Sequence, residues 1–375
     1  MTPAEVPKYD YIDALRGLAV LGVVSVHTTQ LVRPASAGLQ TLATAGGSGV
    51  QLFYLASALT LFLSLATRKS TERNSTLKFF IRRYFRIAPL FYVSVLAYGF
   101  FYGLAPRHWA PTGIDWQDIG LTVLFLHGWH PETINSVVPG GWSIAVEMTF
   151  YLLVPWLFRT LINLRATLAA LFVCLFTSYA GSELLARVLQ GAYSPEHQYL
   201  VKAFSSFWIF AQAPVFICGI LVFHLSRRFR EGNRQTAYLL LILSHGLFLL
   251  IAFRLVPASV LLPQHVLFAF SFILLALSLH HFPVPLYVNR FTILVGKLSF
   301  SIYLVHWLVL EILRPWLAKY LYAKGDFSSL VCFALVLVPS LGLSLITHRF
   351  IETPGIDLGR FIIDRIARTT LPATR

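Results

Sequence analysis

Residues 11–27, YIDALRGLAVLGVVSVH, form an apolar stretch with an arginine near its start and a histidine at its end. A helix turns about 100° per residue, so the eleven steps from Arg16 to His27 make three turns plus about 20°. Both side chains therefore share one helical face, about 16 Å apart at ~1.5 Å rise per residue. Asp13 lies one turn before Arg16 and is expected to pair with it. Ionisable side chains on one face of so apolar a helix need an explanation, and this face is the first candidate for a functional site.

The composition indicates an integral membrane protein. Only 12% of the 375 residues are charged, 57% are hydrophobic, and the mean hydropathy is +0.69. Apolar runs of roughly 17 to 25 residues, long enough to cross a bilayer as helices, recur from residue 11 to residue 348. A membrane β-barrel would alternate with a period of two, and the sequence lacks that alternation. We therefore predict an all-α fold, a polytopic transmembrane helix bundle in the lipid bilayer.

The apolar runs predict about ten crossings. A further run at residues 117–129 is too short to cross and is predicted to be a re-entrant or interfacial segment. The glycine-rich residues 46–49 are expected to form a turn or loop. The predicted spans are residues 11–32, 50–66, 84–104, 142–160, 166–182, 205–225, 236–254, 264–282, 298–314 and 329–348.

Basic residues set the expected orientation. They gather in short loops, such as residues 68–86 and 227–234, and cytoplasmic loops carry such an excess. The bias predicts a multi-pass protein of the cytoplasmic (inner) membrane with both termini cytoplasmic. It also explains the net charge of +14, so nucleic acid is not an expected partner. The predicted domains are a lead at residues 1–9, an integral-membrane domain at 10–355 and a basic cytoplasmic tail at 356–375.

Three arginines stand where the third span begins. Arg83 and Arg86 are three residues apart and share a face. Guanidinium groups bind phosphate in a two-pronged fashion, so Arg86 together with Arg16 is predicted to form a cytoplasmic pocket for a phosphorylated ligand. Anchoring at the membrane surface is the alternative, and it is the favoured role for Arg82.

A carboxylate lies within the span at residues 142–160. Ser143, Glu147 and Tyr151 recur at four-residue steps and form a polar stripe on one face. An unpaired carboxylate at this depth is costly, so Glu147 must be protonated or paired, with His27 or an arginine as its expected partner. A catalytic role is favoured over a structural pair.

The span at residues 298–314 contains a second intramembrane histidine, His306. Ser299 and Tyr303 share a face, and His306 and Trp307 follow one turn later. Hydrogen bonds that support helix packing and recognition of a substrate explain these side chains equally well. For His27, a neutral imidazole is suited both to taking a proton from a hydroxyl and to acting as a nucleophile, and both roles remain open.

Six motifs, in order along the chain, resemble those of the membrane-bound acyltransferase-3 family. They extend over nearly the whole chain, from about residue 9 to residue 355. One departure is Ala58, where the family usually has glycine. The motifs are Arg16 ten residues before His27, among Asp13, Leu15, Gly17 and Ala19; Gly49 and Val50 with Phe53 and Ser57; residues 83–89 with Tyr92; Trp142, Ser143 and Ile144 with Glu147, Phe150 and Tyr151; residues 301–306; and Glu352 with Pro354.

The resemblance implies an acyl-coenzyme A co-substrate, commonly acetyl-CoA, bound from the cytoplasm, and an acceptor often on the far side. It implies His27 as the central catalytic residue and Arg16, Arg83 and Arg86 as functional. The remaining predicted site residues have supporting roles: Asp13, Trp142, Ser143, Tyr151, Tyr303 and His306. No bound cofactor is expected. No metal is expected either, because the three cysteines lack metal-ligand spacing.

The combined prediction is an integral-membrane O-acyltransferase that moves an acyl group, acetyl in the commonest case, from acyl-CoA to a hydroxyl of a carbohydrate such as a surface or exported polysaccharide. The alternative is a secondary transporter in which His27 and Glu147 relay protons. A transporter favours inverted halves with helices broken at matching positions, and the sequence has no such symmetric pair.

Overall fold

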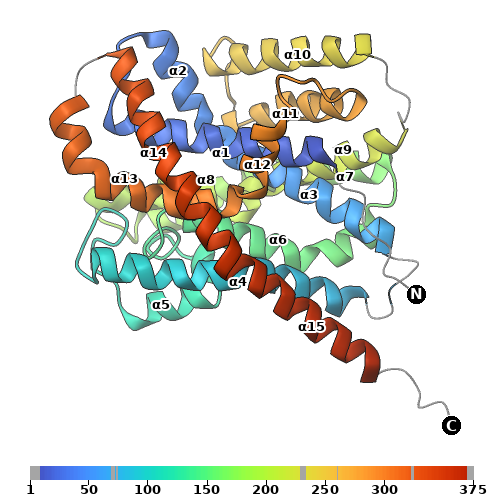
Figure 1. Cartoon of the computed structure of the whole chain (residues 1–375), viewed down its shortest axis with the longest axis horizontal. Coiled ribbons are helices and arrows are strands. Elements are labelled where there is room, and N and C mark those ends of the chain that lie inside the picture. The colour runs from blue at the N-terminus through green and yellow to red at the C-terminus, as the bar shows by residue number, and fades with distance from the viewer. Residues whose placement is uncertain are drawn as a thin grey trace.

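The computed structural model describes residues 9–68, 72, 75–228, 234–259, 261–321 and 325–369. Over these residues ten helical stretches are long and apolar enough to cross a membrane, which confirms the predicted all-α, multi-pass bundle (Figure 1). The main helices are α1 (Asp10–Leu31), α2 (Ala37–Ala45), α3 (Gly49–Arg68), α4 (Ser75–Tyr102), α5 (Trp116–Val123), α6 (Gly141–Thr160), α7 (Leu164–Gln190), α8 (Gln198–Phe207), α9 (Ile209–Arg228), α10 (Arg234–Ala252), α11 (Gln264–His281), α12 (Arg290–Lys297), α13 (Ser299–Leu321), α14 (Asp326–Thr347) and α15 (Thr353–Thr369).

Parts of four predicted regions lie outside the described residues. These are most of the N-terminal lead, residues 1–8; parts of two basic loops, residues 69–71, 73–74 and 229–233; and the end of the basic tail, residues 370–375.

Helix α1 lies inside the bundle and packs against α3, α12, α13 and α14. It approaches α12 through two glycines. A Cβ atom on Gly17 would lie 2.2 Å from the carbonyl oxygen of Thr292, and one on Gly296 would lie 1.7 Å from that of Asp13. Membrane helices pack closely where small residues meet, because no side chain then separates the backbones. The glycines therefore fix the start of α1, which carries Asp13 and Arg16.

The prediction of a turn at residues 46–49 is wrong. Gly46–Ser48 forms a 3-10 helix, η1, that joins α2 to α3 without a loop. Gly46 lies against Gly22 of α1, so close that a Cβ on either glycine would lie within 2.8 Å of the other's carbonyl oxygen. These glycines serve helix contact rather than chain reversal.

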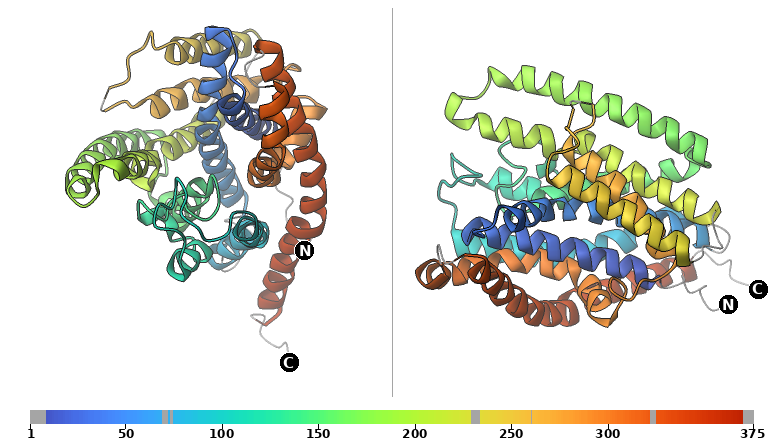
Figure 2. Two further views of the ribbon diagram at one scale, coloured as in Figure 1. Left: turned by 90° about the vertical axis from the view of Figure 1, so that its left-hand side faces the viewer. Right: turned by 90° about the horizontal axis from the view of Figure 1, so that it is seen from above.

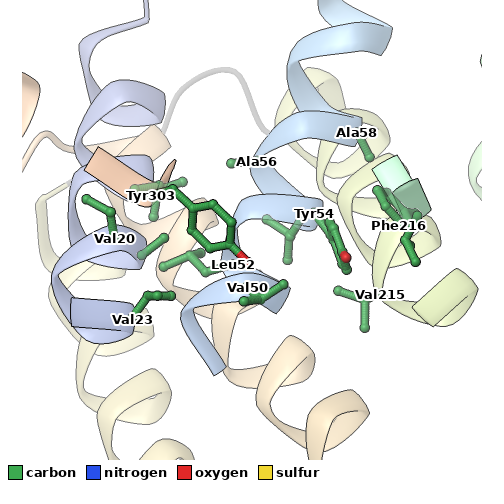
Figure 3. Packing of buried hydrophobic residues seen from close by; sticks show 14 of the residues in the cluster. Val20, Val23, Val50, Leu52, Tyr54, Ala56, Ala58, Val215, Phe216 and Tyr303 are labelled. Atoms are coloured by element: carbon green, nitrogen blue, oxygen red, sulfur yellow. The ribbon is translucent and has the colours of Figure 1, made fainter. Parts of the chain in front are cut away.

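The core lies among α1, α3, α9 and α13. Figure 3 shows Val20 and Val23 of α1 facing α3, with Tyr303 of α13 beside them. On the other side of α3, the ring of Tyr54 stacks on Phe216 of α9, with ring centroids 4.4 Å apart. By contrast, the apolar windows of α7 and α10 are only 11% and 22% buried, as expected for helices that face lipid. Both helices lie at the edge of the bundle (Figure 2).

The predicted short segment at residues 117–129 contains α5 and a 3-10 turn, His127–Trp129. At ~1.5 Å per residue the eight residues of α5 extend about 12 Å, far less than a bilayer. A capping box formed by Asp115 and Asp118 fixes where α5 begins.

The last helices pass the predicted boundary of the membrane domain at residue 355. Helix α14 leads through a π-helical segment, His348–Glu352, into α15, which takes up the start of the predicted basic tail. Helix α15 packs along α4, where a Cβ on Gly355 would lie 2.6 Å from Cγ of Pro89. The first turn of α1 and the last turn of α15 lie toward the same end of the bundle (Figures 1 and 2).

Candidate active site

Two neighbouring cavities hold most of the predicted site residues. The first, which we call the arginine pocket, has a volume of about 210 Å³. It is enclosed by α1, α3, α4, α6 and α13. Its lining includes Arg16, Ser57, Thr60, Arg83, Arg86, Ser143, Glu147, Tyr151 and Tyr303.

Arg16 of α1 is held from two sides. Its Nη1 lies 3.3 Å from Oδ1 of Asp13, so the predicted pair is present. Its Nη2 donates a 2.8 Å hydrogen bond to Oγ1 of Thr60 on α3. Two partners on two helices restrict the guanidinium to one orientation, in which it lines the pocket.

Arg86 of α4 is paired with the buried carboxylate of Glu352. The hydroxyl of Ser301 donates to the same carboxylate, and Nδ1 of His348 lies 3.4 Å from it. Glu352 ends the π-helical segment, and such segments frequently mark functional sites because they turn a side chain out of the regular helical order.

Arg83 lies one turn before Arg86 and also lines the pocket. Among the described residues its buried Nε has no hydrogen-bond partner. A buried donor without a partner costs free energy, and the Arg83 guanidinium supplies positive charge to the pocket. Arg82 does not line the pocket and instead forms a 2.9 Å ion pair with Glu72.

The polar stripe of α6 faces the arginine pocket. Oε1 of Glu147 accepts 2.6 Å hydrogen bonds from the hydroxyls of Ser57 and Tyr151. The hydrogen bonds to Oε1 thus come from two neutral hydroxyls and not from His27 or an arginine, the partners expected for Glu147, while Arg83 interacts with Glu147 only electrostatically. His27 lines the other cavity.

The second cavity, which we call the aromatic cavity, has a volume of about 450 Å³. It shares Val50 and Tyr303 with the arginine pocket, so these two side chains form a common wall. The Tyr303 hydroxyl donates to the carbonyl oxygen of Gly140 at 2.9 Å and accepts from Ser143 at 2.8 Å. The lining includes His27, Gln30, Tyr102, Arg107, Trp109, Trp142, Phe207, Trp307 and Glu311.

His27 is hydrogen-bonded to His306. Nδ1 of His27 lies 2.9 Å from Nε2 of His306, and the two rings are within 6° of coplanar, as an in-plane nitrogen lone pair requires. The indole of Trp307 packs at right angles to the His27 ring, with centroids 4.6 Å apart. Adjacent residues of α13 thus fix the imidazole.

The hydrogen bonds determine which ring nitrogens carry protons. Nδ1 of His306 lies 3.0 Å from the carbonyl oxygen of Ile302, which only accepts, so that nitrogen is protonated. In a neutral His306 ring Nε2 is then bare and must accept from Nδ1 of His27. A neutral His27 consequently has its lone pair on Nε2, the nitrogen left for chemistry in the aromatic cavity.

Sequence reasoning missed several side chains that complete these cavities. Thr60 orients Arg16, and Tyr102 accepts a 3.0 Å hydrogen bond from Nε1 of Trp307. Arg107, which lies between the predicted spans 84–104 and 142–160, lines the aromatic cavity. His127, in the short segment at residues 117–129, is packed in the core and bonded to the Gly141 carbonyl.

Comparisons with known proteins identify the family of the chain. Residues 9–349 match the acyltransferase-3 family, described as "Acyltransferase domain". The protein named "Acyltransferase MdmB" from Streptomyces mycarofaciens is 27% identical over 165 residues, 42% of this chain and 41% of that relative. The aligned region thus spans about two fifths of the relative's length. No solved structure matches the chain significantly. The chain therefore belongs to the acyltransferase-3 family of membrane acyltransferases.

Proposed function

We propose that this protein is an O-acyltransferase that moves an acyl group, acetyl in the simplest case, from cytoplasmic acyl-CoA to a hydroxyl of a carbohydrate. One observation carries the proposal. A histidine whose Nε2 is left for chemistry lines a cavity that shares a wall with a pocket lined by three arginines. Membership of an acyltransferase family supplies the reaction type.

The arginine pocket is the proposed donor site. Arg16, Arg83 and Arg86 provide positive charge for the phosphates of acyl-CoA. A pocket of about 210 Å³ is too small for the whole of acyl-CoA. In this proposal it accommodates the slender acyl-bearing arm, and the nucleotide stays outside. The rise along α1 from Arg16 to His27, about 16 Å, takes the thioester toward the imidazole. The basic loops at the Arg16 end favour a cytoplasmic donor and cytoplasmic termini in the inner membrane.

The chemistry depends on Nε2 of His27. As a general base, this nitrogen takes the proton of the acceptor hydroxyl while the oxygen attacks the thioester carbonyl. The carbon–oxygen bond forms, the carbon–sulfur bond breaks, and the proton passes from His27 to the departing thiolate. As a nucleophile, the same nitrogen carries the acyl group between donor and acceptor. His306 is a positioning residue in both routes because it keeps the proton of His27 on Nδ1.

Glu147 has a supporting role in this proposal. It accepts the hydroxyls of Ser57 and Tyr151 and thereby joins α3 to α6 at the arginine pocket. The alternative proton relay of a transporter needs a connection between His27 and Glu147. The two side chains line different cavities, and each is hydrogen-bonded to other partners.

The test uses the full chain in membranes, acetyl-CoA with a labelled acetyl group, and candidate glycans. His27→Ala is expected to lower transfer by about 100-fold or more, since general acid–base catalysis contributes about 10²–10⁴-fold. His245→Ala is the matched control, because His245 lies on α10, bonds to Tyr287 and lines neither of the two cavities. Transfer by His27→Ala at the wild-type rate would refute the mechanism. Mass-spectrometric detection of an acetyl group on His27 would select the covalent route.

A further inference from the structure

The lining of the aromatic cavity is rich in aromatic rings. Six aromatic side chains contribute to it: Tyr102, Trp109, Trp142, Phe207, Tyr303 and Trp307. Flat rings of this kind pack against the apolar faces of ligands, and ligand cavities are generally lined by such rings with a few polar groups that set orientation.

One wall of the cavity connects Arg107 to His27 by direct contacts. The Arg107 guanidinium lies over the Tyr102 ring, 4.8 Å from its centroid. The Tyr102 hydroxyl accepts from the Trp307 indole, and that indole packs on the His27 ring. The Arg107 guanidinium and the His27 imidazole thus lie on the same wall of the cavity, with the rings of Tyr102 and Trp307 between them.

Arg107 has hydrogen-bonding capacity left over. Its Nη2 donates to the carbonyl oxygen of Ser136 at 2.7 Å. Its Nη1 is buried and has no hydrogen-bond partner among the described residues. A buried donor of this kind is costly until an oxygen reaches it. The other charged side chain of the lining, Glu311, is already engaged by Arg314, whose Nε lies 2.8 Å from Oε2.

A second group of rings lies in the same lining. The indole of Trp142 stacks on Phe207, with centroids 4.2 Å apart and planes 10° apart, and Trp109 lies 6.4 Å from Phe207. These rings come from α6, α8 and the segment between α4 and α5. A ligand in the cavity therefore meets flat apolar surfaces as well as the polar wall of Arg107 and His27.

We propose that the aromatic cavity is the acceptor site and that it binds a sugar unit. The sugar's C–H face packs on the indoles, one of its oxygens faces the Arg107 guanidinium, and a hydroxyl points to Nε2 of His27. The volume of about 450 Å³ falls within the ~300–1,000 Å³ of ordinary small-molecule sites, so one or two rings are bound at a time. Net positive charge from Arg107 disfavours cationic amino sugars. This inference rests on the proposed acyl transfer and adds where and how the acceptor is recognised.

The test measures acetyl transfer by the purified full chain to four probes, the methyl glycosides of glucose, galactose, mannose and rhamnose, with 1-hexanol as an apolar alcohol. Transfer is expected to at least one glycoside. Arg107→Gln and Trp109→Ala are each expected to raise the KM for that glycoside about tenfold, as loss of one charged hydrogen bond or one stacking ring implies. The KM for acetyl-CoA is expected to change less than twofold. Trp109→Phe, which keeps a ring, restores most of the affinity.

Two matched controls stand on the surface away from the cavity. Trp116 on α5 is 80% exposed, and Arg187 on α7 has an 80% exposed side chain. Trp116→Ala and Arg187→Gln are expected to leave both KM values unchanged. Loss of heat stability in Arg107→Gln would be visible as a lower Tm. The comparison of Trp109→Ala with Trp109→Phe then tests the cavity without the Arg107 variant.

The outcomes separate this inference from the proposed function. Transfer to 1-hexanol alone, or to no probe while acetyl-CoA still protects the protein from heat, overturns the assignment to sugars. A glycoside KM unchanged in both cavity variants overturns the assignment of the cavity. Absence of any acetyl-CoA binding or turnover contradicts the proposed function itself.

Discussion

Replacing His306 tests whether the chain of hydrogen bonds behind His27 serves catalysis. His306→Leu keeps the approximate size and removes the acceptor of the Nδ1 proton. His306→Gln places an amide oxygen near the position of Nε2 and keeps an acceptor. If His306 acts only by filling space, the two variants behave alike. If it positions His27, the glutamine variant retains activity that the leucine variant loses.

The magnitude follows from the 2.9 Å contact between the two rings. A neutral hydrogen bond contributes about 0.5–1.5 kcal/mol net, and about 1.4 kcal/mol corresponds to a tenfold change in rate. Without its acceptor, His27 also becomes free to move its proton to Nε2 and to turn away from the cavity. We therefore expect kcat to fall about 10- to 100-fold in His306→Leu and less than about fivefold in His306→Gln, with the KM for acetyl-CoA unchanged.

The assay is steady-state transfer of labelled acetyl by the purified full chain, with Tm measured on the same samples. His265→Leu is the matched control, because His265 also bonds to a single backbone carbonyl, that of Ala211, but lies on α11. It is expected to lower Tm without lowering kcat. A His306→Leu enzyme with kcat within twofold of wild type, or a glutamine variant as impaired as the leucine variant, would refute the reasoning.

Two further predictions concern the surrounding scaffold. Glu147→Gln keeps an acceptor for both hydroxyls at Oε1, so we expect kcat within threefold of wild type. Glu147→Leu leaves both hydroxyl donors without an acceptor and is expected to lower the stability by about 2 kcal/mol or more, measured as a lower Tm. A hundredfold loss of kcat in the glutamine variant would instead show that the carboxylate takes part in the reaction. Gly296→Ala forces a Cβ into the backbone of α1 and is expected to cost about 3 kcal/mol or to abolish folding, while Gly342→Ala, with no atom within 4 Å of its Cβ position, should be neutral or slightly stabilising by size-exclusion and Tm assays.

The sequence was a good guide wherever one helix alone determined the answer. The common face of Arg16 and His27, the pairing of Asp13 with Arg16 and the polar stripe of α6 all follow from helical periodicity. The number of helices long and apolar enough to cross a membrane, ten among the described residues, follows from apolar length, because lipid forces the backbone into helices.

Partners on other helices were beyond the reach of periodicity. The hydrogen bond from His27 to His306 joins residues 279 positions apart, and nothing in the local pattern of α1 or α13 indicates it. The expected pairing of His27 with Glu147 is wrong for the same reason, because the two side chains line different cavities. The prediction of a turn or loop at residues 46–49 is wrong because backbone freedom and close helix packing call for the same residue type, glycine.

The common wall of Val50 and Tyr303 also concerns the membrane as an electrical barrier. If water joined the arginine pocket to the aromatic cavity, protons and ions could pass from one to the other, and an ion gradient across the membrane would be dissipated. Tyr303 is held in place by Gly140 and Ser143, and Val50 has no polar side-chain atom, so the boundary consists of one anchored ring and one apolar side chain. In the proposed reaction the acyl arm passes this boundary to reach His27. Under that proposal, the same two side chains would restrict the passage of ions and admit the acyl group.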